Sequence, residues 1–221
     1  MPEIDIDKIL EKKEKMEEEA KKRNKIVLIS SVIVGVILLG FISFFVIDKI
    51  LGEKSKNYFP FKPGTKIIYN KKNMNPEEWI FMDKTENIGN YECKILNIED
   101  KGNFSNRQEY YFIGKKEGIV RLAISNNFGG KTKVAFRLLP QRIKKGLTFT
   151  AGKEKDKIIE GKIENKETLS LPVGVVESYK VSYTAPPYID EVIWFAKDIG
   201  VVKKVDNIRK IELNLIDMES K

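Results

Sequence analysis

Two patterns of hydrophobic and polar residues divide this chain. Residues 26–47, IVLISSVIVGVILLGFISFFVI, form a run of 22 without a charged side chain. At a rise of 1.5 Å per residue, a helix of this length spans about 33 Å, which matches the hydrocarbon core of a bilayer. From residue 66 to residue 216, short runs alternate between apolar and polar residues with the period of two that half-buried strands show. The pattern therefore predicts a transmembrane helix followed by a β-domain.

The alternating part predicts a mainly β domain. Tyr179, Val181 and Tyr183 share one face of a strand, and the residues between them are polar. We therefore expect the strand to have one buried face and one solvent-exposed face. No amphipathic helix interrupts the runs, which favours a curved antiparallel sheet or a half-barrel. The expected strands are residues 66–69, 79–85, 91–99, 108–113, 119–125, 131–138, 147–150, 158–171, 178–184, 192–196, 201–205 and 210–216.

The apolar run is expected to remain in the protein as a single-pass anchor. It is longer than the core of a usual signal peptide, and neither a small-x-small cleavage site nor a cysteine for lipid attachment follows directly. KKRNK at 21–25 puts four basic residues before the run, whereas DKILG at 48–52 puts one after it. Because positive flanks stay in the cytoplasm, we expect a cytoplasmic N-terminus and an extracytoplasmic C-terminal domain. Lys54, Lys56, Lys62 and Lys66 weaken this bias without reversing it.

Residues 1–25 predict a charged helix that continues into the transmembrane helix. Glutamates stand four residues before a basic residue at four places, beginning with Glu11 and Lys15. We expect a solvated helix, with docking to a partner or to anionic lipid through 21–25 as the alternatives. Ser31 and Gly35 could let two apolar helices approach closely, but small residues facing lipid are the simpler interpretation. The expected organisation continues with a linker at 48–57, the β-domain at 58–217 and a tail at 218–221.

Two segments predict hairpins. GKKEG at 114–118 separates two β-rich runs, and its glycines tolerate the positive φ of a tight connection. EVIWFAKDIGVVKK at 191–204 places Trp194 in a strand that we expect to be covered on both sides. In the following turn, Asp198 can bond to the backbone and Gly200 can adopt a left-handed conformation. We therefore interpret this run as architecture.

Three phrases of the chain resemble the extracytoplasmic domains of bacterial envelope proteins, many of them lipoproteins. The phrases are YFPFKPGTKIIY at 58–69, LSLPVGVVESYKVSY at 169–183 and EVIWFAKDIGVVKK at 191–204. In those domains a YFPLxxGxxWxY opening, a VPAGxF turn and a WYAxxVGLVK hairpin recur. This chain departs from the pattern with Ile67 or Ile68 in place of an aromatic residue, Val173 for Ala and Val176 for Phe. The resemblance implies a curved sheet related to LolA-like lipoprotein carriers, and it implies no agreed activity.

The composition excludes several classes of chemistry. The chain has 221 residues with no histidine and one cysteine, so histidine-dependent triads, histidine zinc sites and an intrachain disulfide are impossible. We expect Cys93 to be a small residue in a strand rather than a reactive thiol. The net charge is +8, from 40 basic and 32 acidic residues, and the basic residues are scattered without a nucleic-acid signature. We therefore expect no nucleic-acid partner, whereas an anionic wall polymer remains a possible one.

The candidate site residues are few, and none defines a catalytic centre. Glu177, Asp190, Glu191 and Asp198 stand near the distinctive phrases, but no spacing brings two of them into one cleft. No oxygen-rich metal loop is present, so we expect no cofactor and no metal.

The sequence favours a non-enzymatic β-domain, held at the membrane for binding or scaffolding in the bacterial cell envelope, with an envelope protein as partner. The alternative is a carrier or sensor of a lipid-like ligand on a concave face lined by aromatic and aliphatic residues. A hydrolase is the third and weakest hypothesis.

Overall fold

A computed structural model describes residues 23, 30–31, 33–37, 51–72, 74–102, 105–126 and 129–219, and the chain divides into two compact units, Met1–Ile50 and Leu51–Lys221. The few described residues of the first unit are helical. Among the residues described, no helix combines the length and apolar character needed to cross a bilayer. The predicted helices at 1–25 and 26–47 lie, apart from these few positions, outside the described residues.

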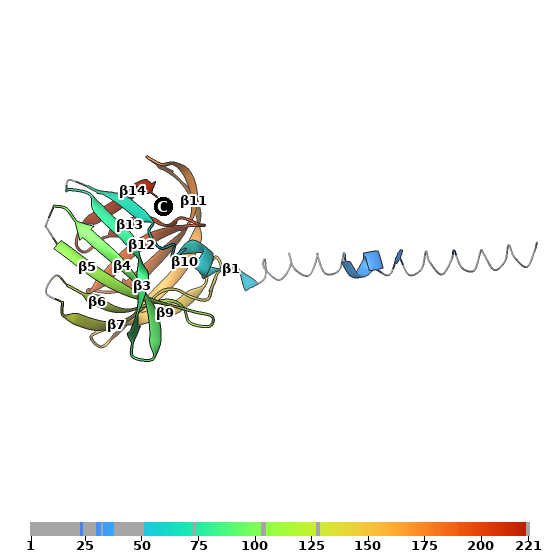
Figure 1. Ribbon diagram of the computed structural model, residues 1–221, viewed down its shortest axis with the longest axis horizontal. Helices are drawn as coiled ribbons and strands as arrows, with labels where there is room; N and C mark the ends of the chain where they lie inside the picture. Colours follow the sequence, from blue (N-terminus) through green and yellow to red (C-terminus); the bar gives the residue numbers. More distant parts are fainter. Residues whose placement is uncertain are drawn as a thin grey trace, which may run out of the picture. The chain divides into compact units, whose positions relative to one another are not determined.

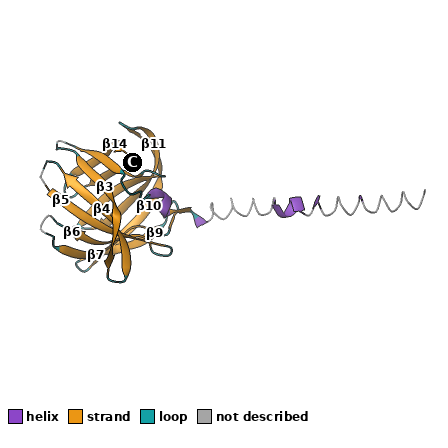
Figure 2. Ribbon diagram, viewed as in Figure 1, coloured by secondary structure: helices purple, strands orange, loops and turns teal. Residues whose placement is uncertain are grey.

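The second unit is built almost entirely from β-strands, as the alternating pattern predicts (Figures 1 and 2). Each of the twelve expected strands corresponds to one observed strand, with ends that differ by a few residues. Two short strands and one 3-10 helix were not expected. The elements are β1 (Glu53–Lys54), η1 (Ser55–Tyr58), β2 (Lys66–Lys71), β3 (Glu77–Ile88), β4 (Tyr91–Asp100), β5 (Ser105–Gly114), β6 (Gly118–Ser125), β7 (Lys131–Leu139), β8 (Arg142–Ile143), β9 (Thr148–Glu154), β10 (Lys157–Leu171), β11 (Gly174–Ala185), β12 (Ile189–Ala196), β13 (Gly200–Asp206) and β14 (Ile211–Glu219).

Twelve strands form one antiparallel sheet in the order β7-β6-β5-β4-β3-β2-β14-β13-β12-β11-β10-β9. Consecutive strands pair from β2 to β7 and from β9 to β14, and β14 pairs with β2, so β7 and β9 are the two edges of the sheet. The sheet curves until its two edge strands meet, and a Cβ placed on Gly152 of β9 would lie 2.5 Å from the carbonyl oxygen of Ala135 of β7. The expected curved antiparallel sheet is confirmed, and it is nearly closed rather than a half-barrel.

The segment from β1 to Phe61 closes one end of the curved sheet. β1 pairs with β8, and the N–H of Asp198 in the β12–β13 turn donates to the carbonyl of Asn57 at 2.7 Å. Phe59 is 2% exposed and lies 5.0 Å, ring centre to ring centre, from Tyr111, whose side chain faces the interior. Residues 53–57, expected to belong to a linker, are therefore part of the domain, because the aromatic residues after them need the enclosed interior to be buried.

The two expected hairpins are confirmed. In the β5–β6 turn, Gly118 has φ +81° and a side chain there would collide with the carbonyl of Leu139. In the β12–β13 turn, Gly200 has φ +103°, as expected, and Asp198 also takes a left-handed conformation with φ +62°. Strand β12 is covered on both faces from Ile193 to Ala196, which is why both sets of alternating residues there are apolar.

A small apolar cluster lies on the outer side of the sheet. Cys93 and Ile95 of β4 pack there with Tyr110 and Ala123, while Leu96 of β4 belongs to the main core. Cys93 is completely buried, and burial raises the pKa of its thiol. The prediction that Cys93 is a packed strand residue is confirmed, because a buried thiol with a raised pKa is a poor nucleophile.

Candidate functional site

The interior of the curved sheet contains a cavity of about 750 Å³. Tyr188, Ile208 and Arg209 of the β11–β12 and β13–β14 turns are exposed lining residues and mark the mouth, and further exposed lining residues lie on the edge strands β7 and β9. Trp79 and Tyr111 line the cavity as well, and Phe59 lies against Tyr111. The cavity is therefore open at the mouth and bounded, toward the other end, by the aromatic residues that follow β1.

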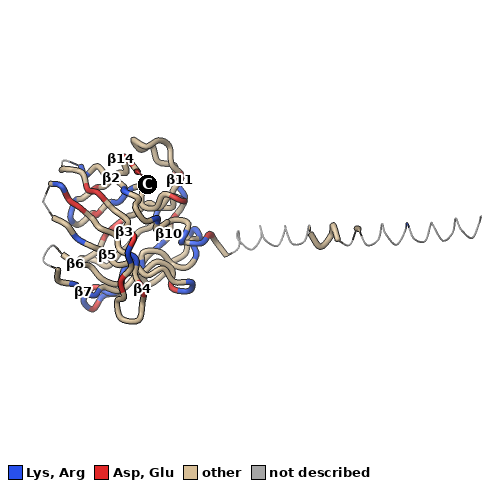
Figure 3. Tube along the Cα trace, viewed as in Figure 1, with Lys and Arg blue, Asp and Glu red and all other residues tan. Residues whose placement is uncertain are grey.

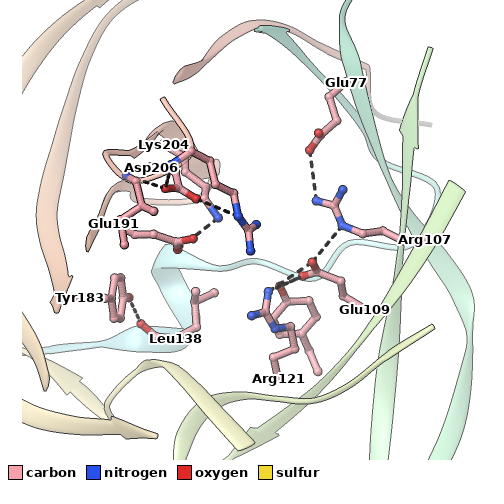
Figure 4. Close-up of polar contacts among 12 residues, drawn as sticks. Glu77, Arg107, Glu109, Arg121, Leu138, Tyr183, Glu191, Lys204 and Asp206 are labelled. Carbon is pink, nitrogen blue, oxygen red and sulfur yellow. Dashed lines mark hydrogen bonds and ion pairs between the residues drawn. The ribbon is translucent and has the colours of Figure 1, made fainter. Parts of the chain in front are cut away.

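Strand β5 brings charged side chains into this cavity by simple alternation. Arg107, Glu109 and Tyr111 face inward, whereas Tyr110 packs in the outer cluster. Glu109 is 5% exposed, and its carboxylate lies 3.2 Å from Nη1 of Arg121 on β6 and 3.3 Å from Nε of Arg107 (Figure 4). The Tyr111 hydroxyl donates to the same carboxylate. Glu109 thus has three donors, which is what a buried carboxylate requires.

The electrostatics of Glu109 follow from these contacts. Burial alone would raise the pKa of the carboxyl, but the charges of Arg121 and Arg107 and the Tyr111 hydrogen bond outweigh it and hold the pKa at about 2. Burial and the neighbouring carboxylate together raise the pKa of the Tyr111 hydroxyl well above its ordinary value. Glu109 is therefore ionised and Tyr111 is neutral at any physiological pH.

Arg107 links Glu109 to a second carboxylate. Its Nη2 lies 3.5 Å from Oε1 of Glu77, which also accepts a 2.7 Å hydrogen bond from the indole N–H of Trp79. Both contacts of Arg107 are long, and its side chain is 39% exposed, compared with 23% for Arg121. Arg107 is thus the more accessible cation of this wall.

The opposite wall has its own ion pairs. Nζ of Lys204 on β13 lies 3.2 Å from Oε2 of Glu191 on β12. Nearer the mouth, Asp206 accepts hydrogen bonds from the backbone N–H groups of Ile208 and Arg209 (Figure 4). A further buried pair joins Lys71 on β2 to Asp100 on β4 at 2.7 Å. The polar lining thus contains ion pairs rather than a patch of one sign, and Figure 3 shows basic and acidic positions interspersed along the strands of the domain.

The charges of the lining nearly cancel. Seven basic and six acidic residues line the cavity, and Asp100 neutralises Lys71 from just outside the lining. The remaining lining is largely aliphatic and aromatic, and it includes Trp79, Phe136 and Leu213. The charged members are Lys71, Arg107, Arg121, Lys133, Lys153, Lys204 and Arg209, with Glu77, Glu109, Glu154, Asp190, Glu191 and Asp206.

The expected concave face of aromatic and aliphatic residues is therefore only half right. The apolar residues are present, but Tyr58 of η1, Phe59 and Phe61 pack against them in the main core. The open part of the interior carries ion pairs that an acyl chain would bury without compensation. Arg107 and Glu109 stand in phase with Tyr111 on the same strand, but Tyr110 and Phe112 on the other face give the sequence no means of telling which face is inward.

The four acidic residues considered for catalysis lie in three places. Asp190 and Glu191 both line the cavity, where Asp190 accepts a 3.0 Å hydrogen bond from Asn207 and Glu191 binds Lys204. Glu177 is exposed on β11 and binds Lys166 at 3.2 Å, and Asp198 is exposed in the β12–β13 turn. The structure brings together two of the four, and a donor engages each of these two.

Within the described ranges, no group of three or more cysteine, aspartate and glutamate side chains is arranged to hold a metal ion. Glu77, Glu109, Glu191 and Asp206 each face a basic side chain, and Asp190 accepts from the Asn207 amide. The arrangement is suited to recognising charges of both signs.

Trp194, the most distinctive residue of the 191–204 run, lies outside this cavity. Its ring lies between Lys180 and Lys203, with ammonium groups 6.0 and 5.4 Å from the ring centre, and its indole N–H donates to Glu167 at 2.9 Å. It is 8% exposed. These contacts favour the structural interpretation of the run.

Replacing Trp194 by alanine tests that interpretation. We expect the free energy of unfolding to fall by about 3 kcal/mol, because a large buried ring is lost and Glu167 loses its donor. Chemical denaturation of the purified chain measures the change. A variant that keeps its stability but loses a binding activity would show instead that Trp194 belongs to a site.

Comparisons with known proteins add little to this description. The chain matches no model of a protein family and no curated protein sequence. Among solved structures, it is similar to an exported protein of Bacteroides fragilis described as having a YmcC-like fold, with 14% identity and a TM-score of 0.44 over 74% of this chain and 99% of that one. It is also similar to a lipoprotein of Parabacteroides distasonis, with 9% identity and a TM-score of 0.34 over 73% of this chain and 98% of that one.

Proposed function

We propose that this protein is a membrane-anchored binding protein whose cavity takes a small zwitterionic molecule, such as a short peptide. The domain binds its ligand without chemical change, and the anchor holds the domain outside the cytoplasmic membrane in the bacterial envelope. The observation that carries the proposal is the charge-balanced, half-apolar cavity inside a nearly closed sheet.

The size and chemistry of the cavity support a ligand of this class. A volume of about 750 Å³ is within the range of small-molecule sites. A ligand with a net charge would leave one side of the balanced lining uncompensated, whereas a zwitterion can exchange its own charges for existing ion pairs. Trp79 and Phe136 provide apolar contact for a side chain between the two charged walls.

The anchor is supported by the sequence. Residues 26–47 are long and apolar enough to cross a bilayer, and the basic residues at 21–25 favour a cytoplasmic N-terminus. Protease added to intact cells should then degrade the β-domain, and full protection of the domain would contradict this topology.

Two neighbouring lysines provide the test of the binding site. Lys204 faces the cavity and pairs with Glu191, while Lys203 faces outward and pairs with Glu212. Their side chains are 25% and 26% exposed, so each alanine substitution removes one partly exposed ion pair, and Lys203→Ala also removes the ammonium group over the Trp194 ring. We expect both variants to lose less than about 1 kcal/mol of stability.

Thermal unfolding of the full chain in detergent, with and without a panel of di- to tetrapeptides, measures the ligand effect. At about 100 times its dissociation constant, a bound peptide adds about 2.7 kcal/mol. We expect this stabilisation in the wild type and in Lys203→Ala, and a loss of most of it in Lys204→Ala. Stabilisation by a fatty acid and not by peptides would favour the lipid-like carrier, and equal responses of the two variants would place the ligand elsewhere.

A further inference from the structure

The β10–β11 hairpin extends beyond the rest of the sheet, as seen at the top of Figure 1. Strand β9 pairs with β10 only as far as Lys162, and β12 pairs with β11 only from Ser178 onward. From the Thr168–Glu177 pair to the Leu171–Gly174 pair, the two strands have only each other as ladder partners. The projection is about 13 Å long at 3.3 Å per residue.

The tip of this hairpin, defined here as residues 168–176 (TLSLPVGVV), carries no charge. Val173 is 40% exposed and Val175 is 74% exposed, the highest value among the large apolar residues of the domain that the structure describes. The turns between β5 and β6, between β9 and β10, between β12 and β13 and between β13 and β14 all contain charged residues. The tip is therefore an apolar projection, whereas these four turns are charged; the β3–β4 and β11–β12 turns also lack charge, but neither carries an aliphatic side chain as exposed as Val175.

The tip lies close to the point where the chain enters the domain. Glu53 of β1 binds Lys166 of β10 at 3.0 Å, and the Tyr179 hydroxyl of β11 donates to the same carboxylate at 3.2 Å. Lys166 and Tyr179 are directly paired, and so are Ser170 and Val175 four residues further along each strand. Because residues two and four apart share a face, Val175 is on the side of the hairpin that Glu53 occupies.

Exposed lysines surround the same entry point. Lys54 and Lys56 flank the start of η1, and Lys144 and Lys145 follow β8, which pairs with β1. Lys197 belongs to the β12–β13 turn, which is hydrogen-bonded to Asn57. A lysine near an anionic bilayer surface contributes about 1 kcal/mol to membrane binding. This end of the domain therefore combines an apolar projection with positive charge, as interfacial membrane contacts do.

We propose that the tip and these lysines dock the domain onto the anionic surface of the bilayer in which the chain is anchored. The proposal rests on the anchor at residues 26–47. Six peptide units separate Ile47 from Glu53, so the entry point stays within about 22 Å of the apolar run. The tip extends a comparable distance from Glu53 and can reach the headgroups.

Docking of this end would turn the cavity mouth away from the bilayer. Gly174, at the tip, and Ala185, next to the mouth turn, are the two ends of β11, about 36 Å apart along the strand. The ligand would then enter from the side of the envelope space and not from the lipid. This geometry agrees with a polar ligand rather than a membrane lipid.

Site-specific fluorescence on the full chain, reconstituted into vesicles of phosphatidylcholine with phosphatidylglycerol, tests the docking. Val175→Cys places a label on the tip, and Ile208→Cys, at a residue 45% exposed beside the mouth, is the matched control. Cys93 is buried and leaves the introduced thiol as the reactive one. With a nitroxide-labelled lipid present, we expect about twofold or greater quenching at position 175 and almost none at position 208.

Three results separate the proposals. If the chain withstands a carbonate wash and position 175 is quenched, docking is supported, and Lys145→Glu with Lys197→Glu should reduce the quenching. If the chain is retained but position 175 is as unquenched as position 208, docking is wrong while the anchor stands. If the wash removes the chain from the vesicles, residues 26–47 do not anchor it, and the docking proposal, which depends on the anchor, is wrong as well.

Discussion

Replacing Glu109 by glutamine is expected to lower the free energy of unfolding by about 4 kcal/mol. The carboxylate is 5% exposed and has Arg121, Arg107 and the Tyr111 hydroxyl as donors. The amide keeps the size of the side chain but leaves the Arg121 guanidinium in the protein interior without its counter-charge. Denaturant unfolding at neutral pH measures the loss.

The same substitution changes the pH dependence of stability. Because the folded pKa of Glu109 is about 2, below the ordinary 4.5, its ionisation stabilises the fold at pH values above 4.5. This contribution is lost as the pH falls from 4.5 toward 2. We therefore expect the difference in stability between the wild type and Glu109→Gln to shrink over that range.

The control for Glu109 is a carboxylate of the outer surface. Glu212 binds Lys203 at 2.9 Å with a side chain that is 30% exposed. Glu212→Gln should cost less than about 1 kcal/mol, because exposed pairs are screened by water. Equal losses in the two variants would mean that the interior ion pairs are as hydrated as those on the surface.

Replacing Phe59 by alanine is expected to cost about 4 kcal/mol. The ring is 2% exposed and packs against Tyr111 and Phe81, with ring centres 5.0 and 6.2 Å away. Its loss leaves a void beneath Tyr111, which holds the Glu109 carboxylate. We therefore expect weaker peptide binding in the cavity as well as a lower midpoint of denaturation.

Phe112→Ala is the matched control for Phe59. Phe112 is only partly buried and contacts the outer cluster and Tyr91, on the opposite side of the sheet from the cavity. We expect a loss of about 1–2 kcal/mol and unchanged peptide binding. If Phe112→Ala proved the more destabilising change, the end closed by residues 53–61 would be peripheral to the fold.

The fold was predictable because its signal is local. Alternation of the kind seen along residues 178–184, and turn glycines such as those of 114–118, depend on only a few neighbouring positions. Signals of these two kinds along the chain located all twelve main strands. β1, η1 and β8 were not predicted. A strand of two residues and a 3-10 helix of four are too short to show a period in the sequence. Their burial depends on an interior that exists only once β14 has returned to β2.

The cavity was less predictable. On β5, the run RQEYYFI has apolar residues on both faces, so the sequence alone does not say whether Arg107 and Glu109 or Gln108 and Tyr110 face the interior. The partners of Glu109 come from β6 and from two positions along its own strand, and Lys204 faces them from β13. β5 and β6 are hairpin neighbours, whereas Lys204 on β13 comes to face them only because the sheet curves.

By itself, the sequence determined that the chain carries one apolar run of bilayer length and one antiparallel β-domain, because both depend on periods read along a single segment. The tertiary structure decided which face of each strand is enclosed, that the segment from β1 to Phe61 fills one end and that balanced ion pairs line the other. The physical reason is that a buried charge is stable only beside its partner, and the enclosed interior that buries these ion pairs exists only after the sheet has curved.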